Sequence, residues 1–294
     1  MAKSKTPLHL CFYRPVASQH TVAAAKIAIS ENKGNQPPPL VLGPGASSHP
    51  LSMALFTGKM WPSSGKTLGV RFLDGSKTQR KLAQKYANEW TQFANVTFKF
   101  NGGASSEIRI SFQADPGSWS AVGTDCLVTG TFPKNQPTMN FGWLKDDTDP
   151  VEWRRVVVHE FGHALGAIHE HQNPKGGIQW NLPAVYATFS GPPNNWSKDE
   201  IDFNIVQKYS IDQLNATEYD PESIMLYSFP AQLIIGGVAT ANNTDLSDED
   251  KKFIGTNYPK KGAAKPAKQS VAAAAAAPKL KSGQRVHPGF PKFA

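Results

Sequence analysis

Apolar residues recur along residues 60–112 at two spacings, one typical of strands and one typical of a helix. Strict alternation predicts three half-buried strands, within residues 61–72, 96–100 and 108–112. Between the first two, residues 76–93 carry apolar side chains on one face of a predicted amphipathic helix. The apolar positions of that face are Leu82, Tyr86, Trp90 and Phe93. This part of the chain therefore predicts a sheet with a long helix packed against it.

A second helical pattern begins at Asp149. Asp149 is suited to cap the helix and Pro150 to occupy its first position, and Glu152 would complete a capping box with Asp149. An apolar stripe at helical spacing anchors the element in a core. Gly166 is placed to end it, because glycine accepts the left-handed conformation found at helix ends. The residues of the stripe are Trp153, Val156, Val157, Phe161 and Ala164.

This helix carries the candidate chemistry. His159 and His163 are four residues apart, so both rings leave one face about 6 Å from each other, close enough for one metal ion to join them. Glu160, rotated by roughly 100°, reaches a metal-bound water without binding the metal. His169 follows six residues after His163, so the chain must turn back to bring it in. Three neutral nitrogens and one open position predict a single catalytic Zn²⁺.

An ordinary buried helix with satisfied histidines is the alternative interpretation of this segment. It explains a single histidine better than a metal site does. It does not explain three histidines and a glutamate at the spacing His-Glu-x-x-His-x-x-Gly-x-x-His, which we therefore interpret as a zinc site.

At these residues the chain resembles the metzincin metallopeptidases, and Glu170 directly after the third histidine resembles the astacin branch. Residues 219–227 are similar to that family's methionine turn, with the form Ser-x-Met-x-Tyr. The resemblance implies that Met225 is the hydrophobic base beneath the histidines. It implies that Tyr227 binds zinc in the resting enzyme and swings away to stabilise the oxyanion. Glu170 is the family's contact, through solvent, to a freshly cut amino terminus.

The resemblance extends over roughly residues 59–259 and implies the fold. The fold class is α+β: a metzincin catalytic domain with a twisted mixed sheet, two long helices above the zinc cleft, and a smaller, largely irregular lower subdomain ending in a helix. Ser247 and Asp250 would cap that closing helix. Residues 117–123 resemble the edge strand against which the family's peptide substrates lie antiparallel.

The implied activity is that of a zinc-dependent endopeptidase acting on protein or peptide substrates. Another metzincin peptidase, such as a serralysin-like enzyme, is an alternative within the same class. A catalytically silent zinc-binding protein is the alternative from another class. Retention of Glu160 argues against the silent protein, because metal binding needs only the histidines.

The chain departs from the family in its cysteines. Secreted astacins hold the domain with two disulfides, whereas this chain has only Cys11 and Cys126, and Ser118 stands where the edge-strand cysteine would be. Lys59 stands where a zinc-blocking aspartate would be. A thiolate is a strong zinc ligand, so one hypothesis is that Cys11 fills the open position and keeps the enzyme inactive. The alternative is an unblocked enzyme in which Cys11 is a buried thiol.

Composition divides the chain of 294 residues into three parts. The net charge of +8 comes from the ends, because residues 60–259 hold 17 basic and 22 acidic side chains. Residues 1–59 are predicted to be an N-terminal extension and a possible pro-segment, residues 60–259 the catalytic domain, and residues 260–294 a basic disordered tail rich in Ala, Lys and Pro.

The remaining expectations concern partners and location. We expect the basic tail to be solvated, with a contact to nucleic acid or an anionic surface as the alternative. We expect a monomer. No secretory signal or membrane span is visible, so a cytoplasmic or non-classically secreted protein is expected.

Overall fold

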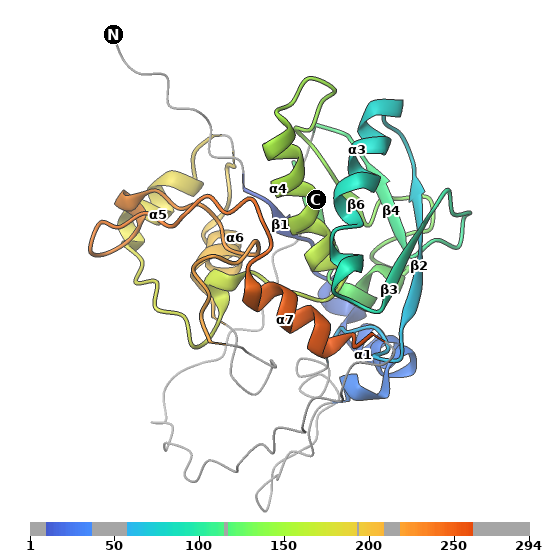
Figure 1. The fold of residues 1–294 in the computed structure, drawn as a ribbon. Helices are drawn as coiled ribbons and strands as arrows, with labels where there is room; N and C mark the ends of the chain where they lie inside the picture. The colour runs from blue at the N-terminus through green and yellow to red at the C-terminus, as the bar shows by residue number, and fades with distance from the viewer. Residues whose placement is uncertain (1–9, 37–57, 115–116, 193, 209–217, 261–294) are drawn as a thin grey trace, which may run out of the picture.

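The computed structural model describes residues 10–36, 58–114, 117–192, 194–208 and 218–260 (Figure 1). A sheet with helices α3 and α4 beside it forms one half, and the region of α5 and α6 lies on the other side of α4. The strands are β1 Phe12–Tyr13, β2 Lys66–Phe72, β3 Val96–Phe100, β4 Ile108–Ser111, β5 Trp119–Ser120 and β6 Met139–Asn140. The helices are α1 Thr21–Glu31, α3 Lys77–Ala87, α4 Pro150–Ala164, α5 Leu182–Phe189, α6 Lys198–Ile201 and α7 Asp248–Asn257.

The strands form one mixed sheet in the order β1-β5-β6-β4-β2-β3. β2 pairs in parallel with β3 and β4, and β4 pairs in parallel with β6. β5 runs antiparallel to β6, and the N-terminal strand β1 then adds in parallel to β5. The mixed sheet was predicted, but two of its strands were not: β6, and β1, which comes from outside the predicted catalytic domain.

The first predicted helix is shorter than expected. Ser76 and Gln79 form the capping box that starts α3, but the helix ends at Ala87 instead of reaching residue 93. Asn88 ends it by donating its side-chain amide to the carbonyl of Gln84 at 2.9 Å, a local bond that competes with helix continuation. Trp90 is nevertheless buried, because the chain continues after α3 as a 3₁₀ turn over Trp90–Gln92.

Helix α4 begins and ends as predicted, with one correction. Asp149 accepts a hydrogen bond from the amide of Val151 at 2.7 Å, and Pro150 takes the first position. The predicted capping box is wrong, because the carboxylate of Glu152 accepts bonds from Trp143 and Arg155 instead. The apolar stripe of the helix is buried as expected. Burying each large apolar side chain of this stripe stabilises the fold by about 1.5–3 kcal/mol. This burial anchors α4 in the core.

The half that contains α5, α6 and α7 is mostly irregular, as the resemblance implied. Ser197 and Glu200 form a capping box at α6, and Ser247 and Asp250 form the predicted one at α7. The α+β metzincin fold class is therefore confirmed. No helix among the described residues is long and apolar enough to span a membrane. The predicted tail lies outside the described residues, apart from Lys260.

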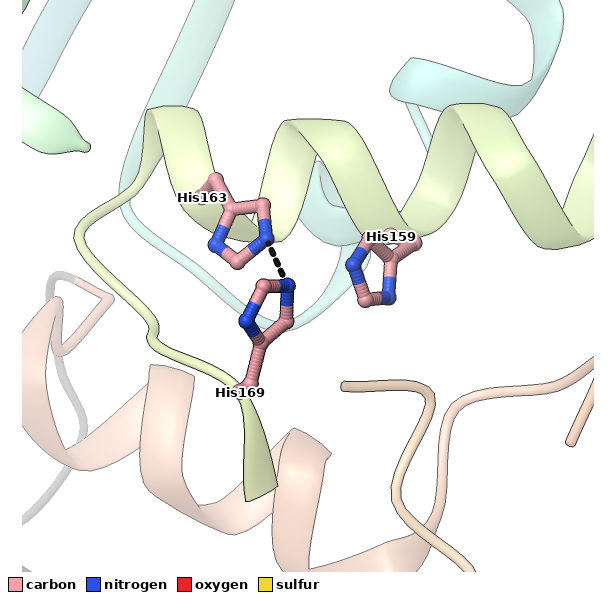
Figure 2. Close-up of side chains that lie close together, drawn as sticks. All are labelled: His159, His163 and His169. Carbon is pink, nitrogen blue, oxygen red and sulfur yellow. Dashed lines mark hydrogen bonds between the residues drawn. The ribbon is translucent and has the colours of Figure 1, made fainter. Parts of the chain in front are cut away.

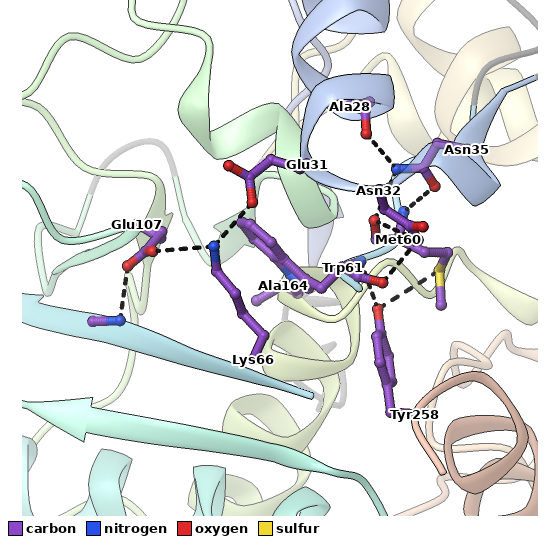
Figure 3. Close-up of polar contacts among 11 residues, drawn as sticks. Ala28, Glu31, Asn32, Asn35, Met60, Trp61, Lys66, Glu107, Ala164 and Tyr258 are labelled. Atoms are coloured by element: carbon purple, nitrogen blue, oxygen red, sulfur yellow. Dashed lines mark hydrogen bonds and ion pairs between the residues drawn. The ribbon is translucent and has the colours of Figure 1, made fainter. Parts of the chain in front are cut away.

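Residues 10–36 pack against the rest of the described chain (Figure 3). The side chain of Asn35 forms hydrogen bonds to both the amide and the carbonyl of Met60, at 2.9 and 2.8 Å. Asn32 donates to the carbonyl of Trp61 at 2.9 Å, and Glu31 pairs with Lys66 at 2.9 Å. The division into an extension over residues 1–59 and a catalytic domain over residues 60–259 stays a prediction.

Candidate metal centre

The last turns of α4 present two of the predicted ligands on one face. The rings of His159 and His163 lie 4.8 Å apart, as the four-residue spacing requires. The helix then ends, and Gly166 adopts a φ of +97°, which a residue with a side chain rarely accepts. This turn sends the chain back towards the helix, and His169 follows it.

Two aromatic side chains from distant parts of the chain fix the end of the helix. The indole nitrogen of Trp61 donates to the carbonyl of Ala164 at 2.8 Å. The hydroxyl of Tyr258 donates to the carbonyl of Leu165 at 2.7 Å. Both carbonyls belong to the group that a helix end leaves without intrahelical partners. The turn that carries His169 therefore starts from a fixed point.

The three histidines converge (Figure 2). One nitrogen from each of His159, His163 and His169 lies within 4.8 Å of the others, and all three side chains are buried. Nε2 of His163 and Nε2 of His169 are 3.0 Å apart. Within the described residues, this is the group of ligating side chains compact enough to hold a metal ion.

Backbone carbonyls set which ring nitrogens face the centre. Nδ1 of His159 donates to the carbonyl of Ile224, and Nδ1 of His163 donates to that of Ala167, both at 2.8 Å. A carbonyl can only accept, so Nδ1 carries the proton and the lone pair is on Nε2. Nε2 of His159 is buried without a hydrogen-bond partner. A buried imidazole nitrogen without a hydrogen-bond partner, close to two other imidazoles, is expected where a metal ion binds.

The electrostatics also suit a metal. Burial lowers the pKa of all three imidazoles, and lowers that of His163 to about 4. The rings are therefore neutral near pH 7, the form that binds zinc. Three nitrogen ligands and an open position match catalytic zinc, so the residues present fit this ion.

The methionine turn lies directly beneath the helix. Met225 is buried, and a β-carbon on Gly162 would lie 2.5 Å from its sulfur. Only glycine at position 162 allows this close approach. The carbonyl of Met225 accepts a hydrogen bond from the amide of Glu170 at 3.0 Å. The turn is therefore tied to the segment directly after the third histidine.

Glu160 and Tyr227 lie at the same centre. Glu160 is fully buried, and burial raises its pKa well above the ordinary value, against the opposing effects of the Cys11 thiol and the Arg155 charge. The hydroxyl of Tyr227 lies 2.5 Å from Nε2 of His169. Burial is also the main reason why the pKa of Tyr227 is raised, so its hydroxyl keeps its proton and remains a donor.

Glu170 forms its side-chain hydrogen bonds with residues other than the three histidines. Its carboxylate accepts hydrogen bonds from the side chain of Asn173 and the amide of Asp220, both at 2.9 Å. Burial raises its pKa to about 7. Glu170 therefore ties the third-histidine segment to the start of the methionine turn, and its predicted contact with a cut amino terminus stays a prediction. His171 is buried against His169, with ring centroids 5.2 Å apart, and lies outside the compact group of three.

Sequence reasoning missed one residue at this centre, Arg155. Arg155 lies four residues before His159 and forms a bidentate pair with Glu152 at 2.7 Å. Its charge lowers the pKa of Glu160. The four-residue spacing from Arg155 to His159 could have indicated that Arg155 lies near the centre. Cys11, which one hypothesis placed at the metal, is fully buried, and Glu160 is among the groups that act on its thiol. Only its identity as a zinc-binding residue type hinted at this position.

Comparison with known proteins decides the family. The family model described as Astacin, a peptidase family, matches residues 57–256. The chain belongs to the astacin family. Astacins are zinc metallopeptidases, so the chain is a hydrolase of this class, as the histidine spacing and the methionine turn predicted.

Solved structures support the assignment. A structure of myroilysin is 43% identical, covers 69% of this chain and 96% of its own, and superposes with a TM-score of 0.65. A crystal structure of myroilysin is 42% identical, covers 69% of this chain and 86% of its own, with a TM-score of 0.54. None of the curated proteins matches the chain.

Proposed function

We propose that this astacin is an endopeptidase that binds one Zn²⁺ through His159, His163 and His169 and uses Glu160 as its general base. The observation that carries the proposal is the set of three buried imidazole nitrogens within 4.8 Å of one another, next to a buried carboxylate. When bound, zinc acidifies a water molecule and polarises the scissile carbonyl.

Glu160 is suited to the proton transfers. Its carboxylate is buried among the ligands, and its pKa is raised by burial. A general base works best when its pKa lies near the operating pH. Glu160 takes a proton from the attacking water and passes it to the leaving amine.

Tyr227 is suited to stabilise the oxyanion. Its neutral hydroxyl lies at the rim of the ligand set, beside His169. A donor that turns from there towards the substrate carbonyl meets the negative charge that develops in the transition state. Met225 has no part in proton transfer and supports the ligands from below.

The substrate groove is proposed to run along β5. By family resemblance, a peptide lies antiparallel to this strand and pairs with its main chain, which reads few side chains. Protein and peptide substrates without strong sequence preference are therefore expected. Glu170 is proposed to support the site from behind the third ligand, through its bonds to Asn173 and Asp220.

The test compares two variants of one turn of α4. Glu160→Gln should keep stoichiometric zinc but lose about 10²- to 10⁴-fold in peptide hydrolysis, because the general base is gone. His163→Ala should lose both zinc and hydrolysis. Zinc is measured by elemental analysis and hydrolysis on casein, with a chelator as control. If Glu160→Gln hydrolyses casein as fast as the unaltered chain, the assigned base is wrong. If zinc is bound but no form of the protein hydrolyses peptides, the chain is a silent zinc-binding protein.

A further inference from the structure

A second polar site lies on the sheet and shares no residue with the proposed metal centre. It is a cavity of about 460 Å³ with a lining of mostly polar side chains. Cavities of this size hold small molecules. The lining residues that matter for its chemistry are Arg14, Asp74, Ser111, Gln113, Trp119 and Asn140.

Three strands build the floor of this cavity. Asn140 of β6 lies directly opposite Ser111 of β4 and Trp119 of β5. Residues opposite one another in neighbouring strands point to the same face of a sheet, so these three side chains form one row. Ile110 and Met139, the residues before Ser111 and Asn140, point to the other face and belong to the hydrophobic core. The pairing register therefore gathers polar groups on one face of the sheet.

The rim of the cavity is held in place by the buried side chain of Arg109. Its guanidinium donates to the carbonyl of Gln136 at 2.8 Å and to that of Phe132 at 2.9 Å. Gln136 lines the cavity, and the ring of Phe132 stacks on that of Trp119 with centroids 6.5 Å apart. Contacts within the protein thus shape the cavity in advance, as is usual for sites that bind small molecules.

Several polar groups of the lining are already satisfied by the protein. The carboxylate of Asp74 accepts hydrogen bonds from the hydroxyl of Ser111 at 2.6 Å and from the amide of Phe112 at 2.7 Å. The side chain of Asn140 bonds to both main-chain groups of Gln113, at 3.1 and 2.8 Å. These groups give the cavity its shape and do not require a ligand.

Two donors of the lining remain without an acceptor. Trp119 is 1% exposed, and its Nε1 is buried without a hydrogen-bond partner. The guanidinium of Arg14 lies 5.0 Å from the centre of the same indole ring. Stacking uses the face of a guanidinium and leaves the N–H groups in its plane free to donate.

The charge of Arg14 is also not balanced. Burial lowers the pKa of Arg14, and no acidic side chain among the described residues opposes this by pairing with it. A charge removed from water is costly unless it is paired, and a buried donor without an acceptor calls for an explanation. An anion that accepts from both Arg14 and Trp119 would remove both costs.

We propose that this cavity binds a small carboxylate that also carries a hydrogen-bond donor, which is the chemistry of a free α-amino acid. The carboxylate accepts from the fork of Arg14, whose geometry suits it, and from Nε1 of Trp119. Asp74 lines the same cavity and disfavours a second negative charge. Its oxygens have lone pairs beyond the two bonds they accept, so the ammonium group of the ligand faces Asp74.

The proposed site goes beyond the peptidase function and does not involve the metal. Arg14 comes from the predicted N-terminal extension, and the other lining residues come from the predicted catalytic domain. The site therefore needs the full chain, and the experiments use it.

The test is a titration of the full chain with alanine, followed by the indole N–H signals in nuclear magnetic resonance spectra. The chain has seven tryptophans, and Trp119→Phe identifies the signal of Trp119. Alanine should shift that signal downfield in a saturable way, because the N–H gains a charged acceptor. Trp180 is the internal control, since its Nε1 is also buried without a partner but does not line the cavity. An unmoved Trp119 signal, or equal shifts at both residues, overturns the proposal.

A second titration compares variants and ligands. Arg14→Gln should bind alanine about 10- to 100-fold more weakly, the usual effect of losing a hydrogen bond to a charged group. Arg71→Gln is the matched control, because Arg71 lies on β2 of the same sheet and does not line the cavity. Acetate, which lacks the ammonium group, should bind more weakly than alanine. Equal affinity of Arg14→Gln and the unaltered chain, or of acetate and alanine, contradicts the proposal.

Zinc must be excluded as the site of binding, because amino acids also bind metal ions. The titration is therefore repeated after zinc has been removed with a chelator, and the shift of the Trp119 signal should be unchanged. A shift that disappears with the metal would overturn the proposal. Loss of peptide hydrolysis in the same sample concerns only the proposed function.

Discussion

Asp250 is joined to His159 through a single residue of the methionine turn. The carboxylate of Asp250 accepts a hydrogen bond from the amide of Ile224, and the carbonyl of Ile224 accepts one from Nδ1 of His159, each at 2.8 Å. The other carboxylate oxygen of Asp250 accepts from the hydroxyl of Ser223 at 2.8 Å. Helix α7 therefore fixes the orientation of a proposed metal ligand on α4 through the backbone of the turn.

Replacing Asp250 with asparagine should weaken zinc binding. The amide offers one acceptor where the carboxylate offers two, and it brings a donor towards groups that already donate. Partners behind a ligand typically contribute about 10- to 100-fold to metal affinity, and an unsatisfied buried group costs about 1–3 kcal/mol. Zinc titration and chemical denaturation measure both effects. Asp248→Asn is the control, because Asp248 is exposed in the same turn and, among the described residues, pairs with Lys251. Equal behaviour of the two variants would contradict the role of Asp250.

Tyr227→Phe should keep zinc but lower the rate of hydrolysis. Zinc retains its three nitrogens, whereas the loss of one oxyanion donor costs about 2.7–4 kcal/mol in catalysis. The comparison is made with the unaltered chain under the same conditions. Zinc content and kcat are measured together. A kcat unchanged within about twofold, on a substrate with rate-limiting chemistry, would show that Tyr227 only packs, since tenfold corresponds to about 1.36 kcal/mol.

Gly166→Ala should destabilise the turn that delivers His169. Gly166 has a φ of +97°, and a β-carbon there would lie 2.6 Å from the sulfur of Met60. The left-handed conformation costs a residue with a side chain roughly 1–2 kcal/mol, so the midpoint of chemical denaturation should fall and zinc affinity should fall with it. Gly177→Ala is the matched control, because no atom lies within 4 Å of its added carbon. A Gly166→Ala chain as stable as the control would show that the turn tolerates a side chain.

Asn35→Ala tests the predicted division at residue 59. The side chain of Asn35 joins Ala28 to Met60 through three hydrogen bonds of 2.8–2.9 Å. If the two parts are separate folding units, hydrogen exchange should speed up in α1 while α4 stays protected. Asn88→Ala is the control, since the side chain of Asn88 donates to Gln84 within its own helix. Faster exchange of α4 together with α1 would mean that both parts unfold as one unit.

The sequence could predict the features that depend on residues close together in the chain. The ligand set follows from two helical spacings and one glycine, and the caps of α4 and α7 follow from single residue types placed before apolar stripes. The end of α3 could not be predicted, because the bond between Asn88 and Gln84 overrides an apolar pattern that continues to residue 93. Glu152 was misjudged because Trp143 and Arg155, not the helix start, are its partners.

Strand β1 could not be predicted from the pattern of apolar and polar residues. Two residues are too few to show alternation, and the pairing with β5 joins segments more than a hundred residues apart. The position of Cys11 depends entirely on that pairing. The hypothesis of a cysteine ligand could therefore be formed from the residue type, but the place of the thiol required the fold.

The pairing of β1 with β5 also bears on how the protein avoids self-association. A strand edge that accepts one extended chain accepts others, and exposed edges are the usual starting points of aggregation. β1 pairs with the edge of β5, and Trp119 of that strand is 1% exposed. Releasing β1 would uncover this edge. β1 thus closes a strand edge that could otherwise pair with a second chain.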